Sequence, residues 1–389
     1  DVPLGMFLSG GVDSSAIAAL MKRMVSGPVK TFSVGYREAE FSELDYARQV
    51  AHCIGSEHHE VVVGMEEFFQ ALPRLIWHED EPITWPSSVS LYFVSRLAAQ
   101  HVKVVLTGEG SDELFGGYAR YRYYLLNRRW MERYRRVPEA VRGWVRSRLG
   151  DSPLLTAALR RKLRHTFLGC GEGVESLYLD NFYGALSQAE QARWLRHPLP
   201  GASPYENFRR YWEDGAGLTP LGRMLYADQK TYLVELLMKQ DQMSMAASIE
   251  SRVPLLDHPL VEFAARLPDR LKLRGTTGKW IVKRAVEDLL PRDILYRRKM
   301  GFPTPLRQWL LEPRATPLFE RLLAPDGLLA AYLNLPALEA LLERHRNRVE
   351  DATDRLWRLL TLQLWGEIFL TRKKPDGIAV LEPAHSAAL

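Results

Sequence analysis

Short apolar runs alternate with longer amphipathic segments over the first part of the chain. Four of the runs have the length and residue types of buried strands: 4–8, 30–34, 60–63 and 102–106. After the first run, apolar residues recur at helical spacing: Ile17, Leu20, Met21 and Met24. A second helix, behind a capping-box pattern at Ser42, and a third over 90–100 are predicted in the same way, the second by Leu44, Ala47, Ala51 and Ile54. This alternation predicts an α/β fold with a doubly wound parallel sheet, which binds ligands at the carboxyl ends of its strands.

The strand pattern disappears beyond about Tyr118, and helical patterns interrupted by prolines follow. The stretch 168–220 is rich in loop-forming residues, and a second helical block begins near Pro220. From Lys373 onward the chain mixes Pro, Gly, Ala and Ser, as frayed termini do. We therefore expect four parts: an α/β core over 1–125, a helical and loop-rich insertion over 126–220, a helical part that completes the site over 221–370, and a flexible tail over 371–389.

The first strand leads into a loop of glycines and hydroxyl side chains, Ser9-Gly10-Gly11-Val12-Asp13-Ser14-Ser15. A strand that turns through paired glycines into a helix leaves backbone N–H groups free at the positive end of the helix dipole, which creates an anion site. The glycines let the backbone approach a phosphate, and the serines add hydroxyl donors. Asp13 belongs in such a site only if a cation lies between it and the phosphates. The loop therefore indicates nucleotide chemistry with magnesium, although it is neither a Walker loop nor G-x-G-x-x-G.

A second constellation follows the strand at 102–106, namely Thr107-Gly108-Glu109-Gly110-Ser111-Asp112-Glu113-Leu114-Phe115-Gly116-Gly117-Tyr118. Three carboxylates, those of Glu109, Asp112 and Glu113, fall within five residues at the end of a strand. So much negative charge is unfavourable unless magnesium and a reacting cation or amine compensate it, and an exposed acidic turn is the alternative reading. Because both loops follow strands of one doubly wound sheet, we expect them to face the same crevice and to share a site.

Later segments place charged residues beside sharp turns. Residues 241–258 combine a helix with a proline turn, and Gly278-Lys279-Trp280 follows them. The segment Arg297-Arg298-Lys299-Met300-Gly301-Phe302 places a lysine close to a glycine. Such a lysine can swing toward a phosphate group on which negative charge develops during a reaction. A solvated basic turn is the alternative interpretation.

Composition excludes several classes of protein. The chain of 389 residues has 46% hydrophobic and 25% charged residues, as globular proteins do, and no apolar run approaches the length of a membrane span. Its two cysteines form no C-x-x-C pair, so we expect the cytoplasm and neither a zinc site nor a disulfide framework. Much of the net charge of +5 comes from arginines between Arg120 and Arg164. We interpret them as the solvated face of helices, with Trp130 and Trp144 facing the core, and nucleic acid is not expected as a partner because no binding motif accompanies them.

In their order along the chain, four motifs resemble the synthetase domain of glutamine-dependent asparagine synthetases, which belong to the PP-loop ATP pyrophosphatases: SGGVDSS, TGEGSDELFGGY, ESRVPLLDHPLVEFA and RRKMGF. The resemblance covers about Asp1 to Leu370 and is weakest between Arg128 and Pro220. It implies a sheet of the ATP pyrophosphatase type with large helical additions. It also implies a ligase that uses ATP to activate the side-chain carboxylate of aspartate as aspartyl-AMP, releases pyrophosphate and then forms asparagine with ammonia.

Position by position, the resemblance assigns roles to residues of both loops. Those expected to contact ATP are Leu8, Ser9, Gly10, Gly11, Asp13, Ser14, Ser15, Val34, Thr107 and Gly108. Asp13 and Asp112 would hold Mg²⁺ and pyrophosphate. Glu109 would serve formation of the acyl-adenylate and position or deprotonate ammonia, while Lys299 would neutralise charge as the α–β bond of ATP breaks. Glu235 is a further candidate for an acid near the acceptor amine, with a surface glutamate as the alternative.

The chain departs from the family in two respects. Full-length members carry an amino-terminal glutaminase domain that begins with cysteine, whereas residue 1 here is Asp and the synthetase motifs begin at once. We therefore expect a separate glutaminase domain or subunit as the ammonia source, with a fragment or an ammonia-dependent form as alternatives. Many relatives also have Asp-Arg-Ala-Ser-Met where this chain has Asp241-Gln242-Met243-Ser244-Met245. Arginine is a common bidentate clamp for carboxylates, so its replacement by Gln242 leaves the acceptor acid open.

Three functions stay open. The first is amidation of aspartate by ammonia, with a homodimer as a candidate assembly. The second keeps the adenylation but changes the acceptor to a sugar acid, a peptide or a β-lactam precursor; Glu109 argues against the last, because those relatives have tyrosine there. A tRNA-modifying enzyme is another version, disfavoured by the motifs beyond the first loop. The third is a non-catalytic nucleotide-binding module, against which Asp13, Glu109, Asp112 and Lys299 argue.

Overall fold

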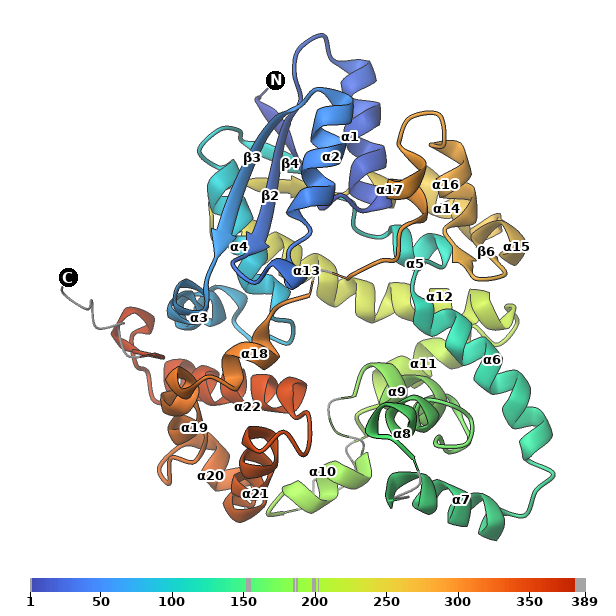
Figure 1. Ribbon diagram of the computed structural model, residues 1–389, viewed down its shortest axis with the longest axis vertical. Helices are drawn as coiled ribbons and strands as arrows, with labels where there is room; N and C mark the ends of the chain where they lie inside the picture. Colours follow the sequence, from blue (N-terminus) through green and yellow to red (C-terminus); the bar gives the residue numbers. More distant parts are fainter. Residues whose placement is uncertain are drawn as a thin grey trace.

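Five parallel strands form one sheet in the order β3-β2-β1-β4-β5. The strands are β1 (Leu4–Phe7), β2 (Lys30–Tyr36), β3 (Glu57–Val63), β4 (Val104–Leu106) and β5 (Glu250–Arg252). The computed structural model describes residues 2–151, 155–184, 186, 188–197, 201, 203–301 and 303–381. From β1 the chain adds β2 and then β3 on one side of the sheet. It then crosses back and adds β4 on the other side of β1, so the direction of strand addition reverses between β1 and β4. The predicted α/β fold with a parallel sheet is confirmed (Figure 1).

Helices cover both faces of this sheet (Figure 1). They are α1 (Val12–Met24), α2 (Leu44–Ile54), α3 (Met65–Glu79) and α4 (Ser87–Ala98). Met6 and Leu8 pack with α1 and α2 in one buried cluster. Phe32 and Val34 of β2 belong to another buried cluster, with α3 and α4. The two clusters lie on opposite faces because successive side chains of a strand alternate between faces.

Two details of the predicted helices are wrong. On α1, Leu20 and Met24 are 47% and 85% exposed, although their spacing places them near the buried side chains. The helix covers only one face of the sheet, so it buries a narrower stripe than the apolar pattern suggests. The capping box at Ser42 does not form: α2 begins at Leu44, behind Glu43, which makes no side-chain cap. Ser42 Oγ instead accepts a hydrogen bond from Leu44 N–H at 3.4 Å.

The prediction that strands end near Tyr118 is also wrong. All three residues of β5 are polar and exposed or half-buried, because β5 is an edge strand. Neither an apolar run nor an alternating pattern therefore marks it in the sequence. It pairs in parallel with β4, and Thr107 N–H donates to Arg252 C=O at 2.9 Å just beyond the paired residues. A small antiparallel pair, β6 (Leu273–Arg274) with β7 (Thr277–Gly278), lies outside this sheet.

Most of the remaining described chain is helical. The helices are α5 (Ser111–Phe115), α6 (Ala119–Tyr134), α7 (Glu139–Asp151), α8 (Ala157–Arg164), α9 (Asp180–Phe182), α10 (Gln188–Trp194), α11 (Glu206–Asp214), α12 (Pro220–Lys230), α13 (Tyr232–Met245), α14 (His258–Arg266), α15 (Asp269–Lys272), α16 (Trp280–Ala285), α17 (Arg292–Tyr296), α18 (Leu306–Leu310), α19 (Thr316–Leu322), α20 (Leu328–Tyr332), α21 (Leu335–Arg346) and α22 (Thr353–Trp365). Single 3₁₀ or π turns occur at Ala39–Phe41, Glu175–Leu179, Pro254–Leu256, Pro313–Ala315, Gly366–Leu370 and Pro375–Gly377.

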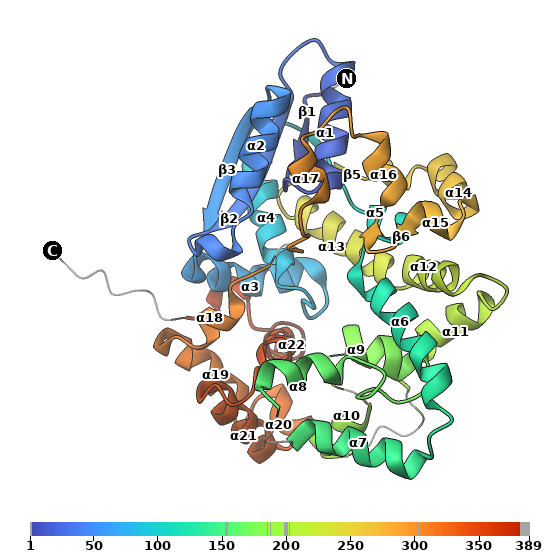
Figure 2. The same cartoon turned by 45° about the vertical axis from the view of Figure 1, so that its right-hand side comes forward.

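The last helices of the described chain share a core with the sheet. The largest buried cluster joins residues of β2, α3 and α4 to residues of α18–α22. At its centre, the ring of Phe68 lies 5.0 Å from that of Trp309 and 5.8 Å from that of Trp357. Figures 1 and 2 both show α18 and α22 beside α3. The predicted tail over 371–389 is described as far as Leu381, where Val380 and Leu381 are buried, and residues 382–389 lie outside the described residues.

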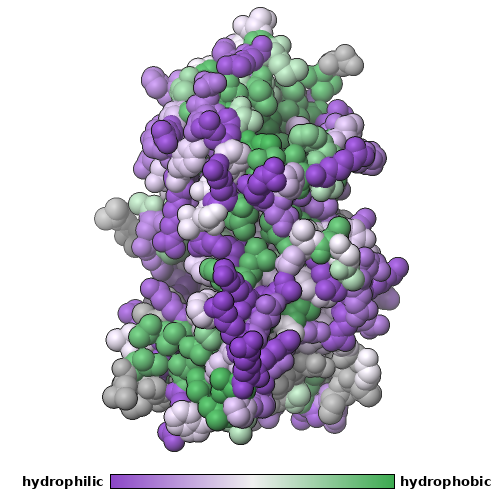
Figure 3. Space-filling model, turned by 90° about the vertical axis from the view of Figure 1, so that its right-hand side faces the viewer, coloured by the Kyte–Doolittle hydropathy of each residue, from purple (hydrophilic) through white to green (hydrophobic). Residues whose placement is uncertain are grey.

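The two tryptophans of the basic region do not face the core as predicted. Trp130 and Trp144 are 48% and 60% exposed, and the guanidinium groups of Arg133 and Arg148 lie 5.3 and 5.9 Å from their rings. Each indole is therefore covered in part by an arginine side chain, which replaces burial in a core. Figure 3 shows the face that carries α6 and α14, where hydrophilic side chains predominate and hydrophobic ones form separate patches. In the described part of the chain, no helix has both the length and the apolarity needed to span a bilayer.

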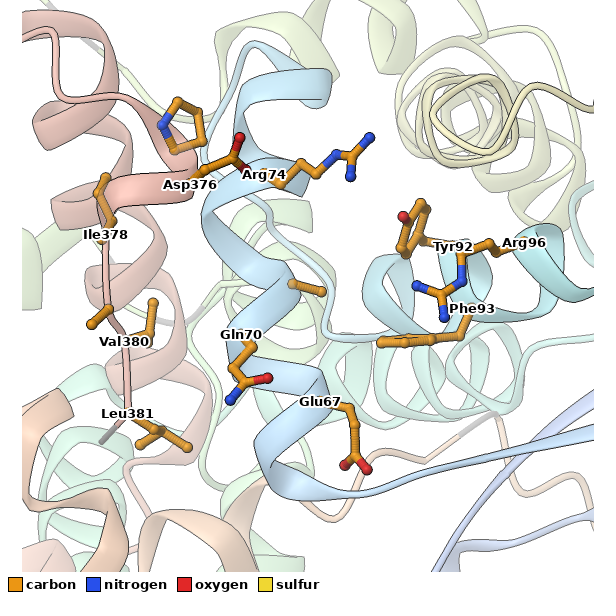
Figure 4. A pocket seen from close by; sticks show the side chains of 13 residues that line it. Glu67, Gln70, Arg74, Tyr92, Phe93, Arg96, Asp376, Ile378, Val380 and Leu381 are labelled. Carbon is orange, nitrogen blue, oxygen red and sulfur yellow. The ribbon is translucent and has the colours of Figure 1, made fainter. Parts of the chain in front are cut away.

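A cavity of about 600 Å³ lies between α3, α4 and residues 375–381. Its wall combines the side chains of Arg74 and Arg96 with Tyr92, Phe93 and the apolar residues near Val380. Figure 4 shows residues 378–381 running along α3 at one side of this cavity. None of the residues to which the sequence assigns a role lines it, so the cavity is separate from the site predicted at the strand ends.

Candidate active site

The loop after β1 has the backbone geometry that the sequence predicts for it. The first intrahelical hydrogen bond of α1 runs from Ser15 N–H to Gly11 C=O at 3.0 Å, which leaves the N–H groups of the preceding turn without helical acceptors. Ser9 Oγ lies 3.1 Å from Ser14 Oγ and accepts from Gly11 N–H at 3.3 Å, so the hydroxyls hold the loop in shape. Gly10 has φ +66°, and a Cβ there would lie 2.6 Å from Tyr46, so only glycine fits this turn.

The phosphate loop (residues 9–15) and the acid loop (residues 107–113) meet at the switch between β1 and β4. A Cβ added to Gly108 would lie 2.8 Å from Ser14 N and 3.0 Å from Asp13 Cβ. The glycine therefore permits the backbones of the two loops to touch. This contact places the phosphate loop beside the carboxylates of the acid loop, as expected for loops at neighbouring carboxyl ends of a doubly wound sheet.

Lys279 joins the two loops. Its Nζ donates to Asp13 Oδ2 at 2.5 Å and lies 2.8 Å from Asp112 Oδ1, and only 4% of its side chain is exposed. The lysine follows β7 directly and has φ +53°, a left-handed conformation that is strained for a residue with a Cβ. Its own N–H donates to Phe115 C=O at 3.1 Å. The β6–β7 turn and α5 thus deliver a buried ammonium between two carboxylates that lie 99 positions apart in sequence, at 13 and 112.

These charges control one another's protonation. Burial alone would raise the pKa of Asp112, but the ammonium groups of Lys279 and Lys299 outweigh it and hold the pKa well below its usual range. Burial would likewise lower the pKa of Lys279, but Asp112 and Asp13 raise it above its usual value. Asp112 and Lys279 are therefore both charged at neutral pH. The buried carboxylate of Asp112 is thus stabilised in its charged form by neighbouring ammonium groups and is not neutralised by protonation.

Lys299 reaches the same carboxylate from the solvent side. Its Nζ donates to Asp112 Oδ2 at 2.6 Å, while 51% of its side chain is exposed. The ammonium also lies 4.6 Å from the centre of the Tyr118 ring. The preceding Arg297 is half-buried: its Nε donates to Gly10 C=O at 3.1 Å and its Nη2 to Glu43 at 2.6 Å. The 297–299 segment is thereby anchored on the phosphate loop and directs a mobile cation to the acid loop; Phe302 of this motif lies outside the described residues.

Glu113, the third carboxylate of the acid loop, is in a different state. It is fully buried, and burial together with the neighbouring charge of Asp112 raises its pKa to about 7. Tyr118 donates a hydrogen bond to its Oε1 at 2.6 Å. Glu109, in contrast, is half-buried and has no hydrogen bond or ion pair with any described residue. Its carboxylate is thus free to meet a ligand, whereas that of Glu113 is held by the protein.

Comparison with known proteins supports the resemblance. The family described as asparagine synthase matches residues 1–367. The chain belongs to the asparagine synthase family. A putative glutamine-hydrolysing asparagine synthetase of Mycobacterium tuberculosis is 39% identical over the whole of this chain, and asparagine synthetase 1 of Bacillus subtilis is 33% identical over 96% of it. The chain spans 58% and 57% of the lengths of these relatives. A more distant relative, the amidase chyE of Penicillium rubens, is 27% identical over 79% of the chain.

The structure of this asparagine synthase family member brings most of the predicted residues together. The phosphate loop, Thr107, Gly108, Asp112 and Lys299 meet at the strand switch. Ser15 Oγ and Thr107 Oγ1 are buried without a hydrogen-bond partner among the described residues. Glu235 lies on α13, half-buried, and its charge acts on Glu79 and Arg358.

Leu8 and Val34 are core residues, and their side chains are only 1% and 8% exposed. Their backbone is placed differently. Leu8 N–H donates to Phe32 C=O at 2.8 Å, at the point where the pairing of β1 with β2 ends, while β2 continues to Tyr36. Backbone groups two residues apart on a strand point to the same side, so those of Val34 point past the end of β1 toward the switch. The prediction that strand-end backbone reads the nucleotide is compatible with this geometry.

Two site residues of this family member were not assigned roles from the sequence. Lys279 follows Gly278, and no local pattern distinguishes it from a surface lysine or predicts its burial between carboxylates. Arg297, in the same motif as Lys299, holds the phosphate loop. The sequence feature that indicates both Lys279 and Arg297 is the excess of carboxylates in the two loops. Such an excess requires buried cations from elsewhere in the chain.

The two predicted magnesium ligands fit a divalent cation. One point, the Nζ of Lys279, lies within 2.8 Å of an oxygen of both Asp13 and Asp112, so the two carboxylates flank one cation position. The other oxygen of Asp13 is buried and has no hydrogen-bond partner among the described residues. Carboxylate oxygens are the ligands that Mg²⁺ prefers, together with phosphate oxygens. The donor set therefore suits Mg²⁺ bound with a nucleotide.

Proposed function

We propose that this chain is the ATP-dependent carbon–nitrogen ligase of an asparagine synthetase, with a sheet of the PP-loop ATP pyrophosphatase type. It would activate the side-chain carboxylate of aspartate as aspartyl-AMP, release pyrophosphate, and form asparagine with ammonia. The observation that carries the proposal is the Lys279 ammonium between Asp13 of the phosphate loop and Asp112 of the acid loop. Hydrogen-bond donors suited to phosphate, carboxylates and buried cations lie together there. Enzymes that transfer phosphoryl or adenylyl groups use these groups.

In the first step an oxygen of the substrate carboxylate attacks the α-phosphorus, and the bond to the bridging oxygen of pyrophosphate breaks. The free N–H groups of α1 would bind the pyrophosphate oxygens. Asp13 and Asp112 would hold Mg²⁺, which neutralises part of the phosphate charge when bound. Lys279 and Lys299 add positive charge where pyrophosphate leaves, and Lys299 can follow the leaving group because its side chain is half exposed. No covalent bond to the protein is required.

In the second step ammonia attacks the acyl carbon and AMP leaves. Glu109 is the unpaired carboxylate of the acid loop, so it is suited to orient ammonia and to accept the proton that ammonia loses. The relatives are named as glutamine-hydrolysing enzymes. We propose that a glutaminase domain or subunit supplies the ammonia for this chain as well.

A second candidate, amidation of a different carboxylic acid, is favoured by one observation. Gln242, where many relatives have arginine, donates its Nε2–H to the backbone C=O of Glu79 at 3.0 Å. This side chain is engaged in holding α3 to α13 and offers no bidentate clamp to a substrate carboxylate. The acceptor would then be a sugar acid or a peptide activated by the same chemistry.

Pyrophosphate release from ATP and Mg²⁺ with ammonium chloride, measured with and without aspartate, tests both candidates. We expect release that depends on aspartate, with asparagine and AMP as products, and a loss of about 10²-fold or more in Glu109→Gln. Glu81→Gln, at an exposed position, is the matched control and should keep the wild-type rate. Release that ignores aspartate but responds to another carboxylic acid would establish the second candidate. No release with any acceptor would contradict the adenylation itself.

A further inference from the structure

At the amino-terminal end of the sheet, away from the strand switch, two histidines and a glutamate lie together. Glu57 and His59 lie at the amino-terminal end of the edge strand β3, and His101 lies in the turn between α4 and β4. Glu57 is exposed, while both histidines are half-buried. None of these residues contributes to the candidate active site, because the loops that form that site follow the opposite ends of the strands.

The geometry of the cluster is close to that of a metal site. One ligand atom from each of the three side chains lies within 4.8 Å of the other two. The rings of His59 and His101 are stacked with centroids 4.0 Å apart, and His59 Nε2 lies 3.0 Å from Glu57 Oε1. Residues 57 and 59 share one face of β3, since side chains alternate along a strand. All three groups therefore converge on one point at the sheet edge.

The protein holds the two imidazoles in place. The ring of Phe32, fully buried in β2, stacks against His59 with centroids 5.3 Å apart. His101 sits in a turn closed by hydrogen bonds of 2.9 Å from the N–H groups of His101 and Val102 to Ala98 C=O. A strand and a closed turn thus fix the two backbones from which the rings project. A site with so little freedom loses little conformational entropy when an ion binds.

We propose that Glu57, His59 and His101 bind one divalent transition metal ion of the Zn²⁺ class. Imidazole nitrogens with one carboxylate are a preferred ligand set for Zn²⁺, Ni²⁺ and Cu²⁺, and three protein ligands leave a coordination position for water. Bonds of about 2.1 Å to Zn²⁺ place the ligand atoms roughly 3.5 Å apart, so the side chains close inward by about 1 Å. Lys30, whose Nζ lies 3.8 Å from Glu57 Oε1, gives up its ion pair when the metal binds.

The bound ion would link the edge strand β3 to the connection before β4. In the sheet, β2 and β1 lie between these two segments. The ion therefore adds a direct link that the backbone hydrogen bonds between strands do not provide. An ion that binds only the folded state raises the free energy of unfolding. The inferred role is therefore structural and independent of the proposed reaction.

Zn²⁺ titration of the full chain, freed of metal with a chelator and kept in excess Mg²⁺ to occupy Asp13 and Asp112, tests the site. We expect one Zn²⁺ per chain in calorimetry and a Zn²⁺-dependent rise in melting temperature. His101→Gln should weaken binding at least about tenfold and abolish the rise. His58→Gln is the matched control: His58 lies on the same strand, 3.1 Å from Glu60, but on the opposite face and without a second imidazole. It should bind Zn²⁺ as the wild type does.

His59→Gln should behave as His101→Gln does, and metal-free melting curves show whether each variant is folded. If the loss of the Phe32 stack unfolds His59→Gln, His101→Gln still decides the question, because the His101 ring is tilted against Phe32 at 5.7 Å and does not stack on it. Co²⁺ should give visible absorption bands in the wild type and in His58→Gln but not in His101→Gln. Equal Zn²⁺ affinity in wild type and His101→Gln, or the absence of saturable binding, would overturn the proposal.

Discussion

Asp112 and Asp228 are both buried carboxylates, but the groups that surround them differ in chemistry and in exposure. Asp228, on α12, is fully buried, and four donors converge on its Oδ2: Tyr121 (2.8 Å), Tyr178 (2.7 Å), Tyr183 (2.8 Å) and Arg120 (3.0 Å). Asp112 contacts the two ammonium groups of Lys279 and Lys299. One carboxylate is thus bound mainly by neutral hydroxyls, and the other entirely by cations.

The comparison separates a structural cluster from a reactive one. Three of the four Asp228 donors are tyrosines that pack in the same buried cluster, so their positions are fixed by burial. Lys299 is half exposed and Lys279 is held by a strained backbone, so the Asp112 cluster stores charge that a ligand can engage. Burial of a carboxylate alone therefore does not indicate a ligand-binding site. Lysine ammonium groups beside the carboxylate that a ligand can also contact do indicate one.

The largest effect is expected for Lys279→Met. It removes the cation between the half-buried Asp13 and the buried Asp112, which leaves the two carboxylates facing each other. We expect pyrophosphate release to fall by about 10²–10³-fold and the free energy of unfolding to fall by about 3–5 kcal/mol. Lys374→Met, at an exposed position far along the chain, is the control and should keep both within a factor of about three in rate and about 1 kcal/mol in stability. A folded Lys279→Met variant with the wild-type rate would remove the distinction between the two clusters.

Lys299→Ala is expected to change the rate without changing stability. Its half-exposed ammonium contributes little to folding, but it is suited to follow the departing pyrophosphate. The rate of pyrophosphate release should drop by about 10²-fold, while the unfolding free energy changes by less than about 0.5 kcal/mol. Arg298→Ala, at the exposed neighbouring position, serves as the control in the same assay and in urea denaturation. Equal losses in the two variants would mean that Lys299 acts only through general surface charge.

Asp228→Asn should show the reverse pattern. The tyrosine hydroxyls and Arg120 lose their charged acceptor, and their burial leaves no water to replace it. Urea denaturation should give a loss of about 2–4 kcal/mol, while the rate per folded molecule stays within about threefold of the wild type. Asp214→Asn, at an exposed position at the end of α11, is the stability control. A large loss of rate without a loss of stability would place Asp228 in the reactive cluster instead.

Glu79 sharpens the comparison because it is a half-buried carboxylate that nearby cations compensate only in part. Burial raises its pKa to about 7 despite the nearby Lys239. The folded state then binds a proton more tightly than the unfolded state, so this group stabilises the fold fully below about pH 4.5 and its contribution is lost as the pH rises toward about 7. Glu79→Gln should flatten the pH dependence of the unfolding free energy in this window by on the order of 1 kcal/mol. An unchanged slope between pH 4.5 and 7 would contradict this account.

The sheet and the two strand-end loops could be predicted because their signals are local. Apolar runs mark β1 to β4, and the glycines at positions 10 and 108 lie within motifs whose spacing is specific. The polar edge strand β5 has no such pattern and becomes a strand only by pairing with β4. The sequence pattern therefore misses β5 for a reason that lies in tertiary structure.

The cations of the site were harder to predict than its carboxylates. Asp13 and Asp112 follow strands and are confined to the sheet's carboxyl edge by the fold class alone. Lys279 reaches them from a hairpin more than 160 residues later, and a single lysine in a turn carries no pattern that indicates burial. The exposed Trp130 and Trp144 show the converse, since a large apolar side chain need not be interior when an arginine covers it.

The core that α3 shares with α18–α22 also affects how the protein folds during its synthesis on the ribosome. Phe68 and its neighbours are synthesised first, and Trp309 and Trp357 follow more than 200 residues later. At about 5–20 residues per second, this delay lasts on the order of tens of seconds. Throughout that interval the nascent sheet presents an uncovered aromatic surface. The amino-terminal half is thus a natural client of holding chaperones until its carboxyl-terminal helices arrive.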